Sequence, residues 1–116
     1  MAATILLGPV AGRSQEAGTA LDETFRVEWT EAAAGPRAKV ALQGRVHNNS
    51  TYRVGGVRLR VAILDGSGRV VSEAFGWVYG DIPAGGDEHF LAPLPRRGEA
   101  YRVSVESFFR VSVGGR

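Results

Sequence analysis

The sequence predicts an all-β domain, an antiparallel β-sandwich of six to seven strands. Three observations support this prediction. Apolar and polar residues alternate with a period of two from Thr24 onward, which is typical of half-buried strands. Turn residues interrupt the alternation about every 8–12 residues, as they do in two-sheet antiparallel domains. No segment has the apolar period of a helix.

Length and composition fit one globular domain. The chain has 116 residues, of which 44% are hydrophobic and 22% are charged. These fractions are ordinary for a folded protein and argue against global disorder. A chain of this length forms a single domain with a substantial core. Cysteine is absent, so disulfides, thiolate metal sites and a cysteine nucleophile are excluded.

The first 22 residues differ from the rest and predict a disordered leader. Residues 2–12 form an apolar run that ends in small residues and is too short to span a bilayer. This run resembles the end of a secretory signal peptide that lacks its basic beginning. Two interpretations remain open, a truncated signal-peptide remnant and a leader without a targeting role. The β-domain is predicted over residues 23–113, and a tail over residues 114–116.

The first two predicted strands are separated by a Gly-Pro turn. In the first strand, Phe25, Val27 and Trp29 alternate with polar residues, which indicates one buried face. The second strand covers residues 38–47, with apolar residues or glycine at its even positions. Asn48 then begins an Asn-Asn-Ser-Thr cluster, a turn sequence whose short polar side chains bond their own backbone.

The third predicted strand has the clearest pattern. Residues 57–63 carry apolar side chains at their odd positions, with Arg58 and Arg60 between them. An Asp-Gly-Ser-Gly sequence at residues 65–68 predicts a hairpin turn. The fourth strand covers residues 70–79, and its alternation places three aromatic residues on one face: Phe75, Trp77 and Tyr79.

Two further segments complete the predicted strands. Residues 89–94 form a short strand that Pro93 and Pro95 demote to a sheet edge or terminate. The last strand, or pair of strands, begins at Tyr101. Phe108 and Phe109 are out of phase within it, so either a bulge intervenes or one ring is exposed.

Several segments, taken in their order along the chain, resemble the FxLYD domain family. Residues 44–50, Gly-Arg-Val-His-Asn-Asn-Ser, are similar to the Gly-x-Val-x-Asn-x-Ser string that precedes a long strand in that family. In the hairpin at residues 61–68 the aspartate of the signature is kept as Asp65. Its Phe, Leu and Tyr positions hold other apolar residues. The likeness covers about residues 24–107.

The resemblance implies an immunoglobulin- or fibronectin III-like β-sandwich from a bacterial or archaeal envelope protein. The predicted location is therefore the periplasm, the cell envelope or the secreted fraction, in agreement with the leader. The family has no established activity and implies no catalytic residues. The matched residues are expected to act in turns, Asp65 as a cap, Gly66 and Gly68 through positive φ, and Asn48 through its side chain.

No arrangement of residues in the sequence predicts an enzyme. Ser67 lies between two strands and not in a strand-to-helix elbow, and no glycine-rich loop precedes a helix. His47 and His89 lack further ligands at a fixed spacing, so no metal site is predicted. We therefore predict a non-enzymatic protein without catalytic residues, metal ion or cofactor.

The candidate binding residues are aromatic and basic: Trp77, Tyr79, Arg58 and Arg60. One interpretation places Trp77, like Trp29, in the core. The other exposes the aromatic residues beside arginine, a combination that is enriched at interfaces. The first predicted function is accordingly a structural or interaction module with an unidentified protein partner. That partner would bind by strand addition at a sheet edge or through an aromatic and arginine surface.

Two other functions are weighed against this one. The alternative is a module that binds carbohydrate or another small ligand, with Trp77 and Tyr79 as a stacking platform. The third is nucleic-acid binding through arginines on one sheet face, for which the candidates are Arg45, Arg58, Arg60 and Arg102. The net charge is only +2, and acidic residues share the same strands. We therefore expect a face of alternating charge pairs and no nucleic-acid partner.

Overall fold

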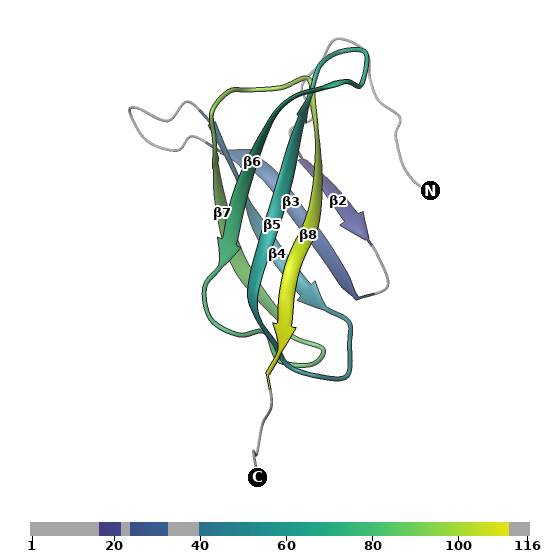
Figure 1. Cartoon of the computed structure of the whole chain (residues 1–116), viewed down its shortest axis with the longest axis vertical. Coiled ribbons are helices and arrows are strands. Elements are labelled where there is room, and N and C mark those ends of the chain that lie inside the picture. The colour runs from purple at the N-terminus through teal and green to yellow at the C-terminus, as the bar shows by residue number, and fades with distance from the viewer. Residues whose placement is uncertain (1–16, 22–23, 33–39, 112–116) are drawn as a thin grey trace.

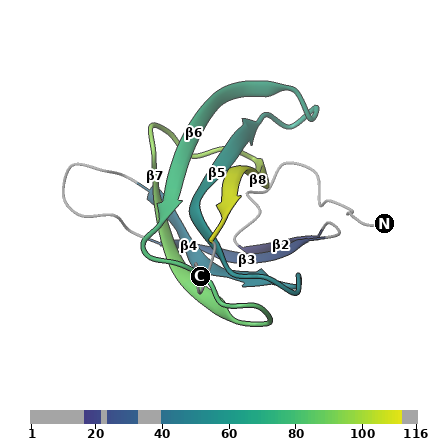
Figure 2. The ribbon, with the colours of Figure 1, turned by 60° about the horizontal axis from the view of Figure 1, so that its bottom comes forward.

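The computed structural model describes residues 17–21, 24–32 and 40–111. Within them, seven antiparallel strands form one strongly curled sheet, a half-barrel, in the order β2-β3-β4-β7-β6-β5-β8 (Figures 1 and 2). The strands are β2 (Ala17–Leu21), β3 (Phe25–Ala32), β4 (Val40–Asn48), β5 (Val54–Leu64), β6 (Val70–Val78), β7 (Asp87–Leu94) and β8 (Ala100–Arg110).

The prediction of an all-β antiparallel domain is confirmed, and the six predicted strands correspond to β3 to β8. The predicted sandwich of two sheets is not seen, because the seven described strands form a single sheet. β6 pairs with β5 along its length and continues to β7 through two residue pairs, Trp77 with Leu91 and Val78 with Phe90. The hydrogen-bonded ladder is therefore continuous, and the sheet curls until β3 faces β8 (Figure 2).

β2 lies at the end of the segment predicted as a leader. Its sequence, Ala-Gly-Thr-Ala-Leu, has little intrinsic strand preference, so the pattern gave no signal there. Pairing with β3 supplies the strand, from Ala17 opposite Thr30 to Leu21 opposite Arg26. Residues 1–16, 22–23 and the predicted tail at 114–116 lie outside the described residues, so the predicted domain boundaries remain a prediction.

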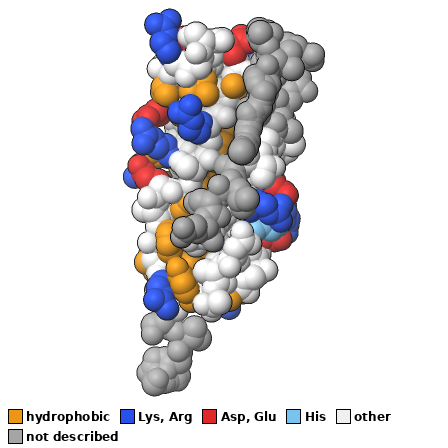
Figure 3. All heavy atoms as spheres, turned by 90° about the vertical axis from the view of Figure 1, so that its right-hand side faces the viewer, with side chains coloured by type: hydrophobic (Ala, Val, Ile, Leu, Met, Phe, Trp, Pro, Cys, Tyr) orange, Lys and Arg blue, Asp and Glu red, His pale blue; other side chains and the backbone are white. Residues whose placement is uncertain are grey.

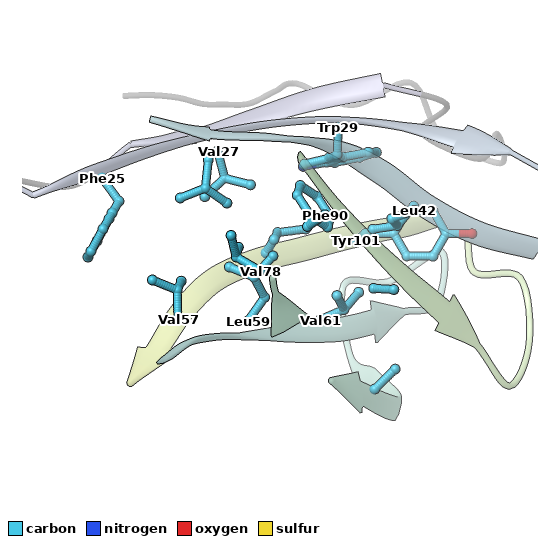
Figure 4. Close-up of a cluster of buried hydrophobic side chains, with 14 of the residues drawn as sticks. Phe25, Val27, Trp29, Leu42, Val57, Leu59, Val61, Val78, Phe90 and Tyr101 are labelled. Atoms are coloured by element: carbon cyan, nitrogen blue, oxygen red, sulfur yellow. The ribbon is translucent and has the colours of Figure 1, made fainter. Parts of the chain in front are cut away.

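The core fills the inside of the curl (Figure 4). Trp29 of β3 and Tyr101 of β8 meet edge to face across it, with ring centroids 5.7 Å apart. Burial of each such side chain stabilises the fold by about 1.5–3 kcal/mol. The core includes inward residues of five strands: Phe25, Val27, Trp29, Leu42, Val57, Leu59, Val61, Ile63, Phe90 and Tyr101.

Small residues lie where the sheet bends. A Cβ atom placed on Gly76 of β6 would lie 2.8 Å from the Cβ of Ala92 in β7. A Cβ atom on Gly44 of β4 would collide with the backbone carbonyl of Glu28 in β3. Larger side chains at either position would push the neighbouring strands apart, so these glycines permit the curl.

Pro93 lies in an interior strand, so the first predicted alternative, an edge position, is wrong. The second alternative agrees with the structure, because β7 ends at Leu94, directly after Pro93. β7 has β4 on one side and β6 on the other. Pro93 is opposite Ala41 of β4, whereas the pairing with β6 extends only over Phe90 and Leu91. Pro93 therefore has a paired strand on one side only, and this is the condition under which a strand tolerates proline.

Asn48 is fully buried at the end of β4 and joins two loops there. Its Nδ2 donates to the carbonyl oxygens of Tyr52, Ile82 and Pro83 at 2.8, 3.1 and 3.1 Å. Its Oδ1 accepts from the N–H and the hydroxyl of Ser50 at 3.0 and 2.6 Å. Both ends of the amide are thus satisfied, as a buried polar group requires.

Glu31 and Tyr101 join β3 to the beginning of β8 at the opposite end of the sheet. The Tyr101 hydroxyl donates to Glu31 Oε2 at 2.6 Å and accepts from the Gly98 N–H at 3.0 Å. Arg97 Nη1 donates to Glu31 Oε1 at 2.7 Å. Burial and the hydrogen bond to Glu31 raise the pKa of Tyr101 to about 12. The phenol therefore stays neutral and donates its hydrogen bond to Glu31.

Asn48→Ala should lower the free energy of unfolding by about 3 kcal/mol, because it leaves several buried partner groups without hydrogen bonds. Urea denaturation measures this change. The matched control is Asn49→Ala, at the exposed neighbouring position, which should change stability by less than about 0.5 kcal/mol. Equal effects of the two substitutions would contradict the role assigned to Asn48.

Tyr101→Phe should cost about 1–2 kcal/mol, because it removes the hydroxyl that serves Glu31 and the Gly98 N–H while keeping the ring in the core. Tyr79→Phe removes a hydroxyl from a side chain that is 82% exposed and is the control. Thermal unfolding of both variants compares them. A Tyr101→Phe variant as stable as the control would show that this bond network does not hold β3 to β8.

Candidate interaction surface

The outer face of β5 and β6 carries three of the four candidate binding residues. In the register of these strands Arg58 is opposite Trp77, and Arg60 is opposite Phe75. Trp77 is 50% exposed and Phe75 is 38% exposed. The prediction that Trp77 lies in the core is therefore wrong. The inward positions of β6 are taken by smaller residues: Ala74, Gly76 and Val78.

Arg58, Phe75, Trp77 and Leu91 form a surface that we call the aromatic–arginine patch. The guanidinium carbon of Arg58 lies 4.1 Å from the centroid of the Phe75 ring and 5.4 Å from that of Trp77, within the range of cation–π interactions. Arg58 Nη1 is also 3.1 Å from Glu106 Oε1. Leu91, 48% exposed, is opposite Trp77 on β7. The cation is thus held against the rings.

The other two candidates lie around this patch. Arg60 donates from Nε to Glu73 Oε2 at 3.0 Å, so its charge is compensated on the same face. Tyr79 follows directly after β6 and is 82% exposed. Sequence reasoning missed Leu91, because only the pairing of β6 with β7 places it beside Trp77.

The arginines predicted as phosphate ligands do not form a free cationic stripe. Arg45 lies on β4, away from the three arginines of β5 and β8. Arg102 is opposite Ala62 at the edge of the sheet. The other three are paired with carboxylates, as the expected alternation of charges requires: Arg45 with Asp87, Arg58 with Glu106 and Arg60 with Glu73.

A second polar cluster lies on the outer face of β3, β4 and β7. His47 lies between two carboxylates, with Nε2 3.4 Å from Glu28 Oε1 and Nδ1 3.4 Å from Asp87 Oδ2. Arg45 donates to Asp87 Oδ1 from Nε and Nη2 at 3.1 and 2.8 Å, and its Nη1 is 2.7 Å from His89 Nε2. The hydrogen bond from His47 lowers the pKa of Glu28, and that from Arg45 lowers the pKa of Asp87.

This cluster is an ion-pair network and not a metal centre. Across the described ranges, no group of three or more histidine and carboxylate side chains could hold a metal ion. Figure 3 shows a histidine with basic and acidic side chains around it at the margin of that view. The same part of the chain contains no helix that is long and apolar enough to cross a membrane.

A groove of about 690 Å³ crosses the outer face of β2, β3, β4 and β7. Its floor is one cross-strand row of residues that lie opposite one another: Gly18, Trp29, Gly44 and Phe90. The row on one side of the floor consists of Thr19, Glu28, Arg45 and His89, and the row on the other side includes Thr30 and Gln43. The groove is open to solvent and not enclosed.

The outermost strands of the described sheet, β2 and β8, lie close to each other. β8 changes phase at a bulge, where its register against β5 shifts next to Arg58. Phe108 meets the Phe25 ring edge to face at 5.0 Å and is still 39% exposed, and Phe109 is 58% exposed. The predicted bulge is therefore present, and both rings of the pair are exposed in part. A strand added to β8 would have to share this opening with β2.

Asp65 organises the turn between β5 and β6. Its Oδ1 accepts from the hydroxyl and N–H of Ser67 at 2.7 and 2.9 Å and from the Arg69 N–H at 2.9 Å. Gly68 has a positive φ of 86°. Gly66 does not have the positive φ expected of it, because one left-handed residue is enough to reverse a chain that Asp65 already holds.

Comparison of the chain with models of protein families, with curated proteins and with solved structures finds no match. The resemblance to the FxLYD family therefore remains a prediction.

Asp65 should make folding stability depend on pH in acid. Hydrogen bonds from Ser67 and then Arg69 lower its pKa from 3.8 to about 2. Its stabilising effect is therefore complete above about pH 4 and is lost as the pH falls towards 2. Asp65→Asn keeps a side-chain oxygen acceptor but cannot titrate. Urea unfolding between pH 6 and about pH 2 should show a smaller acid loss for this variant than for the unmodified chain.

The pKa values of Glu28 and Asp87 are also lowered. Both residues are present in the unmodified chain and in the Asp65→Asn variant, so they contribute equally to the acid loss of stability in each. Identical pH profiles of the two proteins would contradict the role of Asp65.

Proposed function

We propose that this chain is a non-enzymatic interaction module that binds a protein partner through the aromatic–arginine patch. The observation that carries the proposal is the stacking of Arg58 on Phe75 beside Trp77, on an exposed sheet face. Tryptophan, tyrosine and arginine are the residues in which binding energy concentrates at protein interfaces. A cation already held against the rings loses little conformational freedom when a partner binds.

The surroundings of the patch also suit a protein partner. Arg60 and Glu73 pair on the same face, and Glu106 pairs with Arg58, so the apolar centre has a polar rim. An apolar centre inside a polar rim is the usual anatomy of a protein interface.

We also infer that the curled sheet is a variant of the immunoglobulin- or fibronectin III-like fold. Two features support this inference. The two-pair contact between β6 and β7 nearly separates β2, β3, β4 and β7 from β6, β5 and β8. The Tyr101 hydroxyl accepts a backbone hydrogen bond from Gly98, which is similar to the tyrosine corner of immunoglobulin-like domains. The proposed location, the periplasm or cell envelope, is supported by the signal-like composition of residues 2–12.

Carbohydrate binding is the second candidate function, and the groove beside His89 favours it. The platform predicted from the sequence, Trp77 with Tyr79, is a weaker location. Arg58 already lies over the Trp77 ring, and a sugar would compete with it for that face. Nucleic-acid binding finds no support in the paired arginines.

Trp77→Ala should weaken capture of the protein partner by about 30-fold, the effect of removing one central interface residue worth about 2 kcal/mol. The measurement is a crosslinked pulldown from envelope and cytoplasmic fractions, followed by titration with the purified partner. Val70→Ala, at a position on β6 that is 48% exposed and outside the patch, is the matched control.

Capture that Val70→Ala preserves and Trp77→Ala weakens by about 30-fold supports the proposal. Capture that is insensitive to Trp77 would contradict it, and so would recovery of nucleic acid alone.

A further inference from the structure

We propose that the groove across β2, β3, β4 and β7 is a binding site for a neutral oligosaccharide, next to the aromatic–arginine patch but distinct from it. The groove runs at right angles to the strands, because its floor is a single cross-strand row that includes Gly18 and Gly44. With neighbouring strands about 4.8 Å apart, the four strands of the groove span about 14 Å. An extended ligand of a few sugar units matches this shape better than a compact one.

The side chains along the groove match hydroxyl groups. Thr19 and Thr30 carry hydroxyls, and Gln43 carries an amide, so each both donates and accepts hydrogen bonds. Glu28 and His89 also line the groove but are already engaged by Arg26, His47 and Arg45. A sugar hydroxyl also donates and accepts, and it can use the groups of Thr19, Thr30 and Gln43.

The charges along the groove are compensated within the protein. Arg45 donates two hydrogen bonds to Asp87. Glu28 forms ion pairs with Arg26 and His47. A phosphate or a nucleotide would therefore find no unpaired cation here, whereas a neutral ligand leaves the pairs intact. This balance favours an uncharged saccharide over an anionic ligand.

Leu91, an apolar residue of the aromatic–arginine patch, lies next to one end of the groove. It is opposite Gln43 of β4 and is 48% exposed, about 5 Å from Gln43 by the spacing of neighbouring strands. The C–H face of a sugar ring can pack on Leu91 while the neighbouring units bond the polar walls.

The test is a titration of the ¹⁵N-labelled full chain, followed by NMR, with chitotriose and maltotriose as neutral probes. Saturable shifts of the backbone amides of Gly44, Arg45 and His89 are expected for at least one trisaccharide. Gln43→Ala and Thr30→Val should each weaken binding by about five- to tenfold, the effect of one lost hydrogen bond. Both residues are exposed, and the NMR spectrum reports whether each variant is folded.

Phe75→Ala, which alters only the patch, is the matched control and should leave the affinity within about twofold. The absence of saturable shifts with both trisaccharides would overturn the proposal. Shifts confined to Trp77 and Tyr79 would also overturn it and would restore the stacking platform. Equal shifts with inorganic phosphate at the same ionic strength would assign the groove to anions instead. None of these outcomes bears on partner capture through Trp77, so the two proposals fail independently.

Discussion

The structure depends on one buried asparagine, Asn48, which holds together the loops at one end of the sheet. Asn48 donates to carbonyl oxygens of both adjoining loops, and its own backbone bonds Gly85 and Gly86 at 2.9 and 2.8 Å. A buried polar group with all its partners in place is stable in one geometry only. The end of β4, the beginning of β5 and the beginning of β7 are therefore set together. The register of β4 against β7 places Gln43 beside Leu91, and the register of β5 against β6 places Arg58 beside Trp77.

The strands were predictable because the alternation of side chains is a local property. Phe25, Val27 and Trp29 point inward as their spacing requires. Strand pairing is not local, and the two differences from the prediction follow from it. β2 has no pattern of its own and exists as a strand through β3. The two predicted layers are joined by the short contact of β6 with β7, which no periodicity within either strand can indicate.

Local sequence likewise predicted the role of a turn residue but not the burial of the surface residues. Asp65 bonds to residues two and four positions away, so its role was visible in the Asp-Gly-Ser-Gly sequence. For Trp77, alternation gives the face shared with Phe75, but it does not say which face of β6 is buried. The small inward residue Gly76 decides that point, because β7 comes close to it at Ala92. Pairing of the arginines with carboxylates on other strands likewise depended on register.

The short seam between β6 and β7 has a mechanical consequence. Two residue pairs join the wing that bears Arg58 to the wing that bears Gln43, so the backbone ladder does little to fix the angle between the wings. Packing inside the curl fixes it instead, chiefly Trp29 against Tyr101 and Phe25 against Phe108. Core side chains thus set the orientation of the two outer surfaces relative to each other. A change of volume at Phe25, which belongs to neither outer surface, would rotate one outer surface relative to the other.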